Sequence, residues 1–132
     1  MKKMAMIFGV VLLLSGIAGF IPALTPDGKL LGVFATNGVH NAIHIVTGLA
    51  ALAAGAASDH AARLFFRIFG VVYALVAVLG MVQGDQPLLG IVAHNMPDMW
   101  LHVAIAAFAL YCGFARRADT HGAGRGPTLS GA

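Results

Sequence analysis

The chain alternates between long apolar runs and short segments that carry nearly all of its charge. Four runs of 23, 29, 17 and 17 uncharged residues are bounded by residues 3 and 27, 29 and 59, 67 and 85, and 98 and 116. A helix rises about 1.5 Å per residue, so roughly 17 to 25 residues cross the hydrocarbon of a bilayer. The pattern therefore predicts four transmembrane helices, near residues 4–23, 39–57, 64–83 and 98–115.

The composition and the distribution of charge agree with this pattern. Of 132 residues, 59% are hydrophobic and 10% are charged, whereas soluble domains carry about 25% charged residues. Only Lys29 falls on one side of the predicted helices; the other side holds Lys2, Lys3, Arg63, Arg67, Arg116, Arg117 and Arg125. The positive-inside rule then predicts a bacterial inner-membrane protein with both termini in the cytoplasm. The net charge of +3 is a topology signal, and no nucleic-acid partner is expected.

The sequence also contains an internal repeat. Residues 7–11, with the sequence IFGVV, recur as residues 68–72, and LLGVFATN at 30–37 is followed by LLGIVAHN at 88–95. Each unit holds two helices, so both units must enter the membrane in the same direction. Because the third predicted helix is retained, the first is expected to be retained too, rather than cleaved as a signal peptide.

These patterns together predict the fold class and the domain organisation. We expect an all-α, integral membrane four-helix bundle in residues 1–117, built from a duplicated parallel repeat at about 7–57 and 68–115. The following segment, 118–132, is rich in glycine and low in apolar residues, which is typical of a disordered tail.

Polar residues inside the apolar segments gather where the second and fourth predicted helices begin. They are Asn37, His40, Asn41 and His44 in the second helix and Asn95, Asp98 and His102 in the fourth. Spacings of three and four place each set on one face of its helix. Asn37 and Asn95 are predicted N-caps, and Asp98 suits the first turn of a helix. Asn41 suits an interhelical hydrogen bond.

The segments NGVHNAIHIVTG at 37–48 and NMPDMWLH at 95–102 carry a family resemblance. Together with Leu31 and Gly32, they resemble the bacterial membrane protein family catalogued as domain of unknown function 4383. The resemblance covers about residues 5–115 and implies a four-helix membrane protein. In that family an Asn or Asp and a His recur at the starts of the second and fourth helices. The family brings no established activity, so the resemblance implies no mechanism.

The histidines leave two interpretations open. In the first, His44 and His102 bond to each other or to Asn41, and the polar stripe is structural or binds a membrane partner or ligand. In the second, His40, His44, Asp98 and His102 bind a transition metal, or His44 and His102 are the axial ligands of a b-type haem. His94, by contrast, is expected to be a solvated loop residue.

Other function classes are weakly supported. The single cysteine, Cys112, excludes a dithiol redox motif, and the absence of a charged residue near mid-membrane argues against a proton-coupled carrier. We therefore expect a non-enzymatic membrane protein surrounded by lipid, with a metal- or haem-binding redox protein as the alternative and a small-solute carrier as a weaker one. Whether the chain forms a homo-oligomer is left open.

Overall fold

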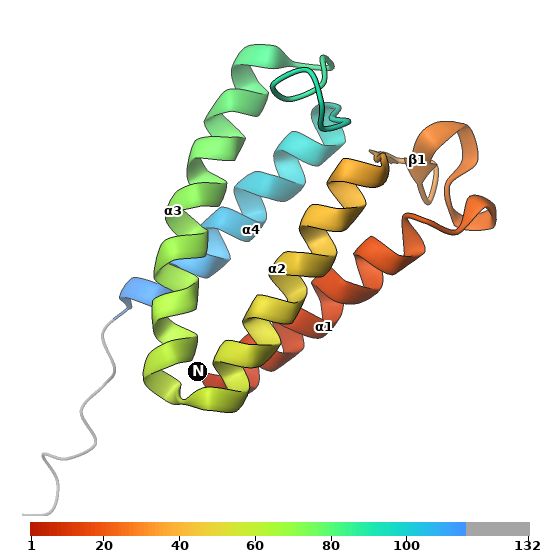
Figure 1. The fold of residues 1–132 in the computed structure, drawn as a ribbon. Coiled ribbons are helices and arrows are strands. Elements are labelled where there is room, and N and C mark those ends of the chain that lie inside the picture. Colours follow the sequence, from red (N-terminus) through yellow and green to blue (C-terminus); the bar gives the residue numbers. More distant parts are fainter. Residues whose placement is uncertain (116–132) are drawn as a thin grey trace, which may run out of the picture.

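The computed structural model describes residues 1–115, and the predicted tail at 118–132 lies outside the described residues. This part of the chain is all-helical apart from two short strands. Its four α-helices are α1 (Lys2–Ala18), α2 (Gly38–Ala57), α3 (Asp59–Gln83) and α4 (Met96–Phe114). They form two antiparallel hairpins, α1 with α2 and α3 with α4 (Figure 1). In residues 1–115, α2, α3 and α4 are long and apolar enough to cross a membrane, and α1 is shorter at 17 residues.

The first helix ends earlier than predicted, at Ala18 instead of residue 23. Pro22 causes this, because a proline drives the residue before it out of the helical region. Ile21 is accordingly extended, with φ of −93° and ψ of 112°. The chain then forms two single 3-10 turns, η1 (Pro22–Leu24) and η2 (Pro26–Gly28), before the antiparallel strands β1 (Lys29–Leu30) and β2 (Phe34–Ala35).

The third helix begins earlier than predicted, at Asp59 instead of residue 64. Ser58 alone separates it from α2, and the Ser58 hydroxyl accepts a hydrogen bond of 2.9 Å from the backbone N–H of Ala61. A serine N-cap of this kind satisfies a donor that the first helical turn leaves free. The first turn of α3 therefore includes residues that the charge pattern had assigned to a loop.

Glycines allow the helices within each hairpin to approach closely. A Cβ on Gly9 would lie 2.7 Å from the carbonyl oxygen of Gly48, and one on Gly70 would lie 2.9 Å from the backbone nitrogen of Leu110. α2 and α3 contact each other far less than the helices within a hairpin do. Aromatic rings also pack between the hairpins: Phe8 of α1 lies edge-on against Phe69 of α3, with ring centroids 5.1 Å apart.

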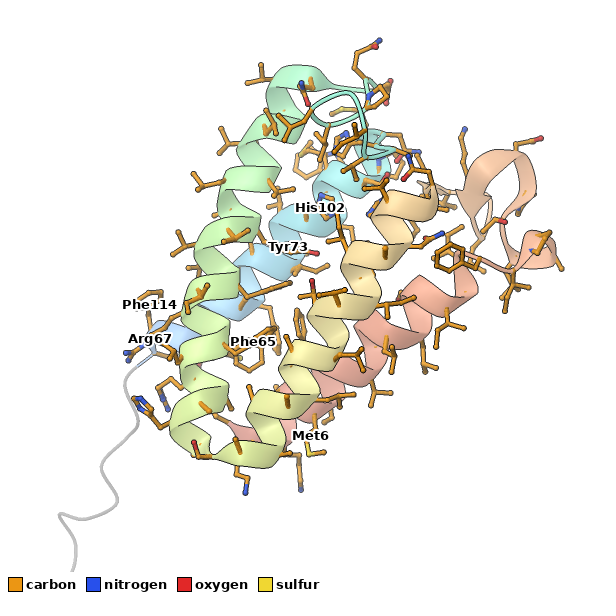
Figure 2. All side chains as sticks on the ribbon, viewed as in Figure 1. Met6, Phe65, Arg67, Tyr73, His102 and Phe114 are labelled. Carbon is orange, nitrogen blue, oxygen red and sulfur yellow. The ribbon has the colours of Figure 1, made fainter. Side chains whose placement is uncertain are left out.

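Two arginines of α3 bind the C-terminal end of α4. Arg63 donates a hydrogen bond of 2.9 Å to the carbonyl of Ala115, and Arg67 donates one of 2.7 Å to the carbonyl of Gly113. Figure 2 shows the side chains of Arg67 and Phe114 at this end, where the guanidinium lies 5.5 Å from the ring centroid. Cationic groups at a helix C-terminus satisfy free carbonyls and complement the helix dipole.

Candidate metal centre

The polar ends of α2 and α4 are held in place by two asparagine caps, as the sequence predicted. The Asn37 side chain accepts a hydrogen bond of 2.9 Å from the backbone N–H of His40. The Asn95 side chain accepts one of 3.1 Å from Asp98, whose carboxylate in turn accepts one of 3.1 Å from the Asn95 N–H. This reciprocal capping box fixes the first turn of α4.

The same two asparagines join the halves of the molecule. Asn37 donates through Nδ2 to the carbonyl of Ile91, at 3.0 Å, and Asn95 donates through Nδ2 to the carbonyl of Val33, at 2.9 Å. Each cap residue thus bonds to the loop that precedes the other cap. These two bonds bring the histidine-bearing starts of α2 and α4 together.

Three imidazoles meet at this junction. His40 and His44 come from successive turns of α2, and His102 comes from α4. One ring nitrogen from each lies within 4.8 Å of the others. The ring centroid of His40 is 4.6 Å from that of His44 and 6.0 Å from that of His102. Figure 2 shows His102 on the side of α4 that faces α2.

Two of these imidazoles carry buried nitrogens without a hydrogen bond to any described residue, Nε2 of His44 and Nδ1 of His102. His102 is only 4% exposed, and leaving a buried polar atom unpaired costs about 1 to 3 kcal/mol. His40 differs, because its Nδ1 lies 3.1 Å from the carbonyl oxygen of Ala35. A proton on Nδ1 would donate to this carbonyl and leave the lone pair on Nε2, the arrangement typical of a metal-ligating histidine. The His40 ring also has a backbone contact with Ala93.

Asp98, which the sequence placed among the metal ligands, is not part of this group. Its carboxylate is buried at 2% exposure and is occupied by the capping box and by the backbone of Ala35. In the described residues the cluster consists of three histidines. Asn41, the other polar residue of the predicted stripe, accepts a hydrogen bond from the hydroxyl of Thr36.

The prediction that His94 is a solvated loop residue is wrong. His94 is 3% exposed, and its ring stacks on that of His102 with a centroid distance of 5.9 Å. Its Nδ1 lies 2.8 Å from the carbonyl oxygen of Gly84, and its Nε2 has no hydrogen bond among the described residues. No sequence pattern indicated this, because the position of the His94 ring depends on the carbonyl of Gly84 that lies within its reach in the fold.

A cleft of about 540 Å³ adjoins the cluster, with His40 and His102 in its wall. Tyr73 of α3 also lines this cleft, and its ring meets that of His102 edge-on at 5.5 Å. Tyr73 was not predicted from the sequence, because a tyrosine in an apolar helix carries no local signal for a site. The cluster therefore has three imidazoles on one side and an apolar space on the other.

The fold and the cluster define a class: a small helical chain with candidate membrane spans and a buried group of histidines. Within that class, the chain belongs to the family described as Domain of unknown function (DUF4383), and the match covers residues 2–115. The resemblance inferred from the segments at 37–48 and 95–102 is thereby confirmed. No curated protein and no solved structure matches the chain.

Proposed function

We propose that this protein is an integral membrane protein that binds one transition metal ion through His40, His44 and His102. The observation that carries the proposal is that one ring nitrogen from each of the three histidines lies within 4.8 Å of the others. In the same cluster, Nε2 of His44 and Nδ1 of His102 are buried without a hydrogen bond to the described residues. A bound ion accounts for both lone nitrogens at once. In the structural alternative His44 and His102 bond to each other or to Asn41, and these two nitrogens make no such bond in the part of the chain that the structure describes.

The donor set suggests which metals fit. Neutral imidazole suits zinc, copper, iron and nickel. With Zn–N bonds of about 2.0–2.1 Å, nitrogens around a tetrahedral zinc ion lie about 3.4 Å apart, so small side-chain rotations bring the three rings into bonding distance. Three protein ligands leave one position open, which is the pattern of reactive zinc centres and differs from closed structural ones.

A compact ion fits the cluster better than a haem does. A haem between His44 and His102 needs a flat slot that separates the two axial imidazoles. His40 packs edge-on against His44 and also lies near His102. Its ring therefore stands close to the space that a haem between those two histidines would need. We therefore favour the metal form of the proposal.

The duplicated, parallel arrangement belongs to the same proposal. Three pairs of counterparts support it: the reciprocal bonds of Asn37 and Asn95, the contact of Phe8 with Phe69, and the φ of 53° shared by Leu31 and Leu89. Such pairs are expected around a pseudo-two-fold axis along the membrane normal. α1 then serves as a fourth crossing, with both termini on the cytoplasmic side of a bacterial inner membrane.

Metal binding is tested on the full chain purified in detergent. After incubation with Zn²⁺ or Co²⁺ and removal of excess metal, elemental analysis is expected to give one equivalent per chain, and Co²⁺ should give the visible absorption of a tetrahedral site. The His44→Ala, His102→Ala double variant should lose this equivalent. His60→Ala is the matched control, because His60 is exposed at the start of α3. Binding that survives in the double variant, or no binding by the wild type, contradicts the proposal.

Membrane orientation is tested separately with single cysteines. In a Cys112→Ser background, cysteine at Lys29 should react with an impermeant maleimide added to intact cells. Cysteine at His60 should react only after the cells are opened. The reverse labelling would contradict the proposed orientation. Labelling of both positions in intact cells would show that the chain does not cross the membrane between residues 29 and 60.

A further inference from the structure

The cleft beside the histidines extends along the length of the bundle. Its lining includes residues of α3 from Phe65 to Leu79, which span about 21 Å at 1.5 Å per residue. Residues of α2 and the loop at 88–92 complete the walls. The cleft is thus elongated and parallel to the helices, and it covers most of the roughly 30 Å thickness of a hydrocarbon core.

The cleft opens toward the side of the bundle. Three of its lining residues remain well exposed in the isolated chain: Ile43 at 40%, Ile68 at 59% and Val72 at 48%. In the orientation proposed above, Ile68 and Val72 face the bilayer, because they are exposed on the central turns of α3, and Ile43 is exposed on the second turn of α2. A molecule dissolved in the membrane therefore reaches the cleft without passing through water.

Polar groups in the cleft are few and uncharged. Among the described residues that line it none is Asp, Glu, Lys or Arg, and the polar side chains are His40, Thr47, Tyr73 and His102. The Thr47 hydroxyl already donates to the carbonyl of Ile43, at 2.7 Å. The Tyr73 hydroxyl makes no hydrogen bond to a described residue, and Nδ1 of His102 is buried and unpartnered. The Tyr73 hydroxyl is thus an unused polar group in a wall that is otherwise hydrocarbon, whereas His102 is a proposed metal ligand.

We propose that the cleft binds a neutral, bilayer-dissolved molecule with a long apolar chain and a single oxygen-bearing head, the chemistry shared by prenyl quinones and long-chain alcohols. The chain lies along α3, and the head oxygen reaches the Tyr73 hydroxyl and the open coordination position of the metal ion. A cationic head is disfavoured, because the metal ion is itself positive and no Asp or Glu among the described residues lines the cleft to pair with it. The inference rests on the proposed function for the metal contact alone.

The size of the cleft favours such a ligand over a second protein chain. About 540 Å³ lies within the roughly 300–1,000 Å³ of small-molecule sites. An extended chain with a small head is a ligand of this size, whereas a whole helix about 10 Å across is a much larger body.

Binding is measured by native mass spectrometry of the zinc-loaded chain with decylubiquinone, 1-dodecanol and dodecane as probes. At least one of the two oxygen-bearing probes should bind one to one, and which of them binds distinguishes a quinone site from an alcohol site. Dodecane, which lacks oxygen, should bind at least about tenfold more weakly, the effect of one good hydrogen bond. No binding of either oxygen-bearing probe, or equal binding of all three, overturns the inference.

Two variants locate the ligand. Val72→Trp should fill the cleft and abolish probe binding with zinc stoichiometry unchanged. Its matched control is Val71→Trp, since Val71 is 47% exposed on the same helix but does not line the cleft. Tyr73→Phe should weaken the oxygen-bearing probes about tenfold and leave dodecane unaffected. If Val72→Trp changes the oligomeric mass and not probe binding, the cleft is an interface between copies and the inference is overturned.

The same series separates this inference from the proposed function. If the chain binds zinc but none of the oxygen-bearing probes selectively, the cleft ligand is wrong and the metal centre still stands. If the chain takes up no zinc but binds a probe in a way that depends on Tyr73, the proposed metal centre is wrong. The cleft ligand is then supported through its contact with the tyrosine.

Discussion

Leu31 and Leu89 adopt the same left-handed backbone conformation, each with a φ of 53°. Each is followed by a glycine of positive φ, 73° at Gly32 and 76° at Gly90, and each turn is closed by a backbone hydrogen bond of 3.1 Å. Two positive φ values in succession are typical of the type I′ turn, which prefers Asn at the first central position. Leucine costs roughly 1 kcal/mol there, so both loops store strain at equivalent positions.

Replacing the strained leucine should stabilise the protein in detergent. Leu31 is 67% exposed, so Leu31→Asn loses little packing and is expected to raise the free energy of unfolding by about 0.5–1 kcal/mol, because asparagine tolerates the left-handed region. Thermal unfolding followed by circular dichroism measures the change. Val33→Asn is the control, since Val33 is exposed in the same loop without a positive φ. A loss of stability in Leu31→Asn would show that the leucine contributes packing that outweighs its strain.

The cap residue Asn37 combines two interactions that substitutions can separate. Asn37→Ala removes both the cap and the bond to Ile91, and should destabilise the protein by about 2 kcal/mol. Asn37→Asp keeps an acceptor at the helix N-terminus and removes only the Nδ2 donor, so about 1 kcal/mol is expected. Unfolding in detergent should show that the wild type is the most stable, Asn37→Asp less stable and Asn37→Ala the least stable. Equal stability of the Ala and Asp variants would mean that the cap contributes nothing.

Close packing within the first hairpin depends on Gly9. The Cβ of Gly9→Ala would lie 2.7 Å from the carbonyl oxygen of Gly48, so the helices must separate, at a cost of about 1–3 kcal/mol. Gly38→Ala is the matched control: its Cβ meets nothing nearer than 3.9 Å, and alanine is the better helix former. Gly38→Ala should be neutral or stabilising in the same assay. A neutral Gly9→Ala would contradict the close α1–α2 contact.

The sequence predicted the features that depend on local pattern. The four helices follow from the apolar runs, and the caps Asn37 and Asn95 follow from residue type and position, because an N-cap needs only a short polar side chain before a helix. The early end of α1 was equally visible in the sequence, since Pro22 stands within the apolar run. The helix was predicted to end at residue 23 because the apolar run was counted through the proline. In the fold, the backbone restriction that Pro22 imposes ends the helix earlier, at Ala18.

The three histidines of the site were predicted from the sequence, whereas the roles of two neighbouring residues were not. The spacing of His40 and His44 on one helix face predicted part of the cluster. The equivalent positions of His44 and His102, each seven residues after its cap asparagine, predicted the third histidine. The roles of Asp98 and His94 were not predictable, because they depend on which backbone groups lie within reach of their side chains in the fold. Asp98 is taken up by the cap, whereas His94 is drawn inside by the carbonyl of Gly84.

His94 should act on the metal centre through its neighbour. Its ring stacks on His102 and is anchored by the carbonyl of Gly84 at 2.8 Å, so it limits the orientations that His102 adopts. His94→Phe keeps an aromatic ring but loses the anchor, and zinc affinity should fall by about tenfold at an unchanged stoichiometry of one, as for residues that orient metal ligands. Competition with a chelator in detergent measures this affinity, and His60→Phe should leave it unchanged. Loss of the bound equivalent would instead make His94 a fourth ligand, and an unchanged affinity would reduce its role to packing against His102.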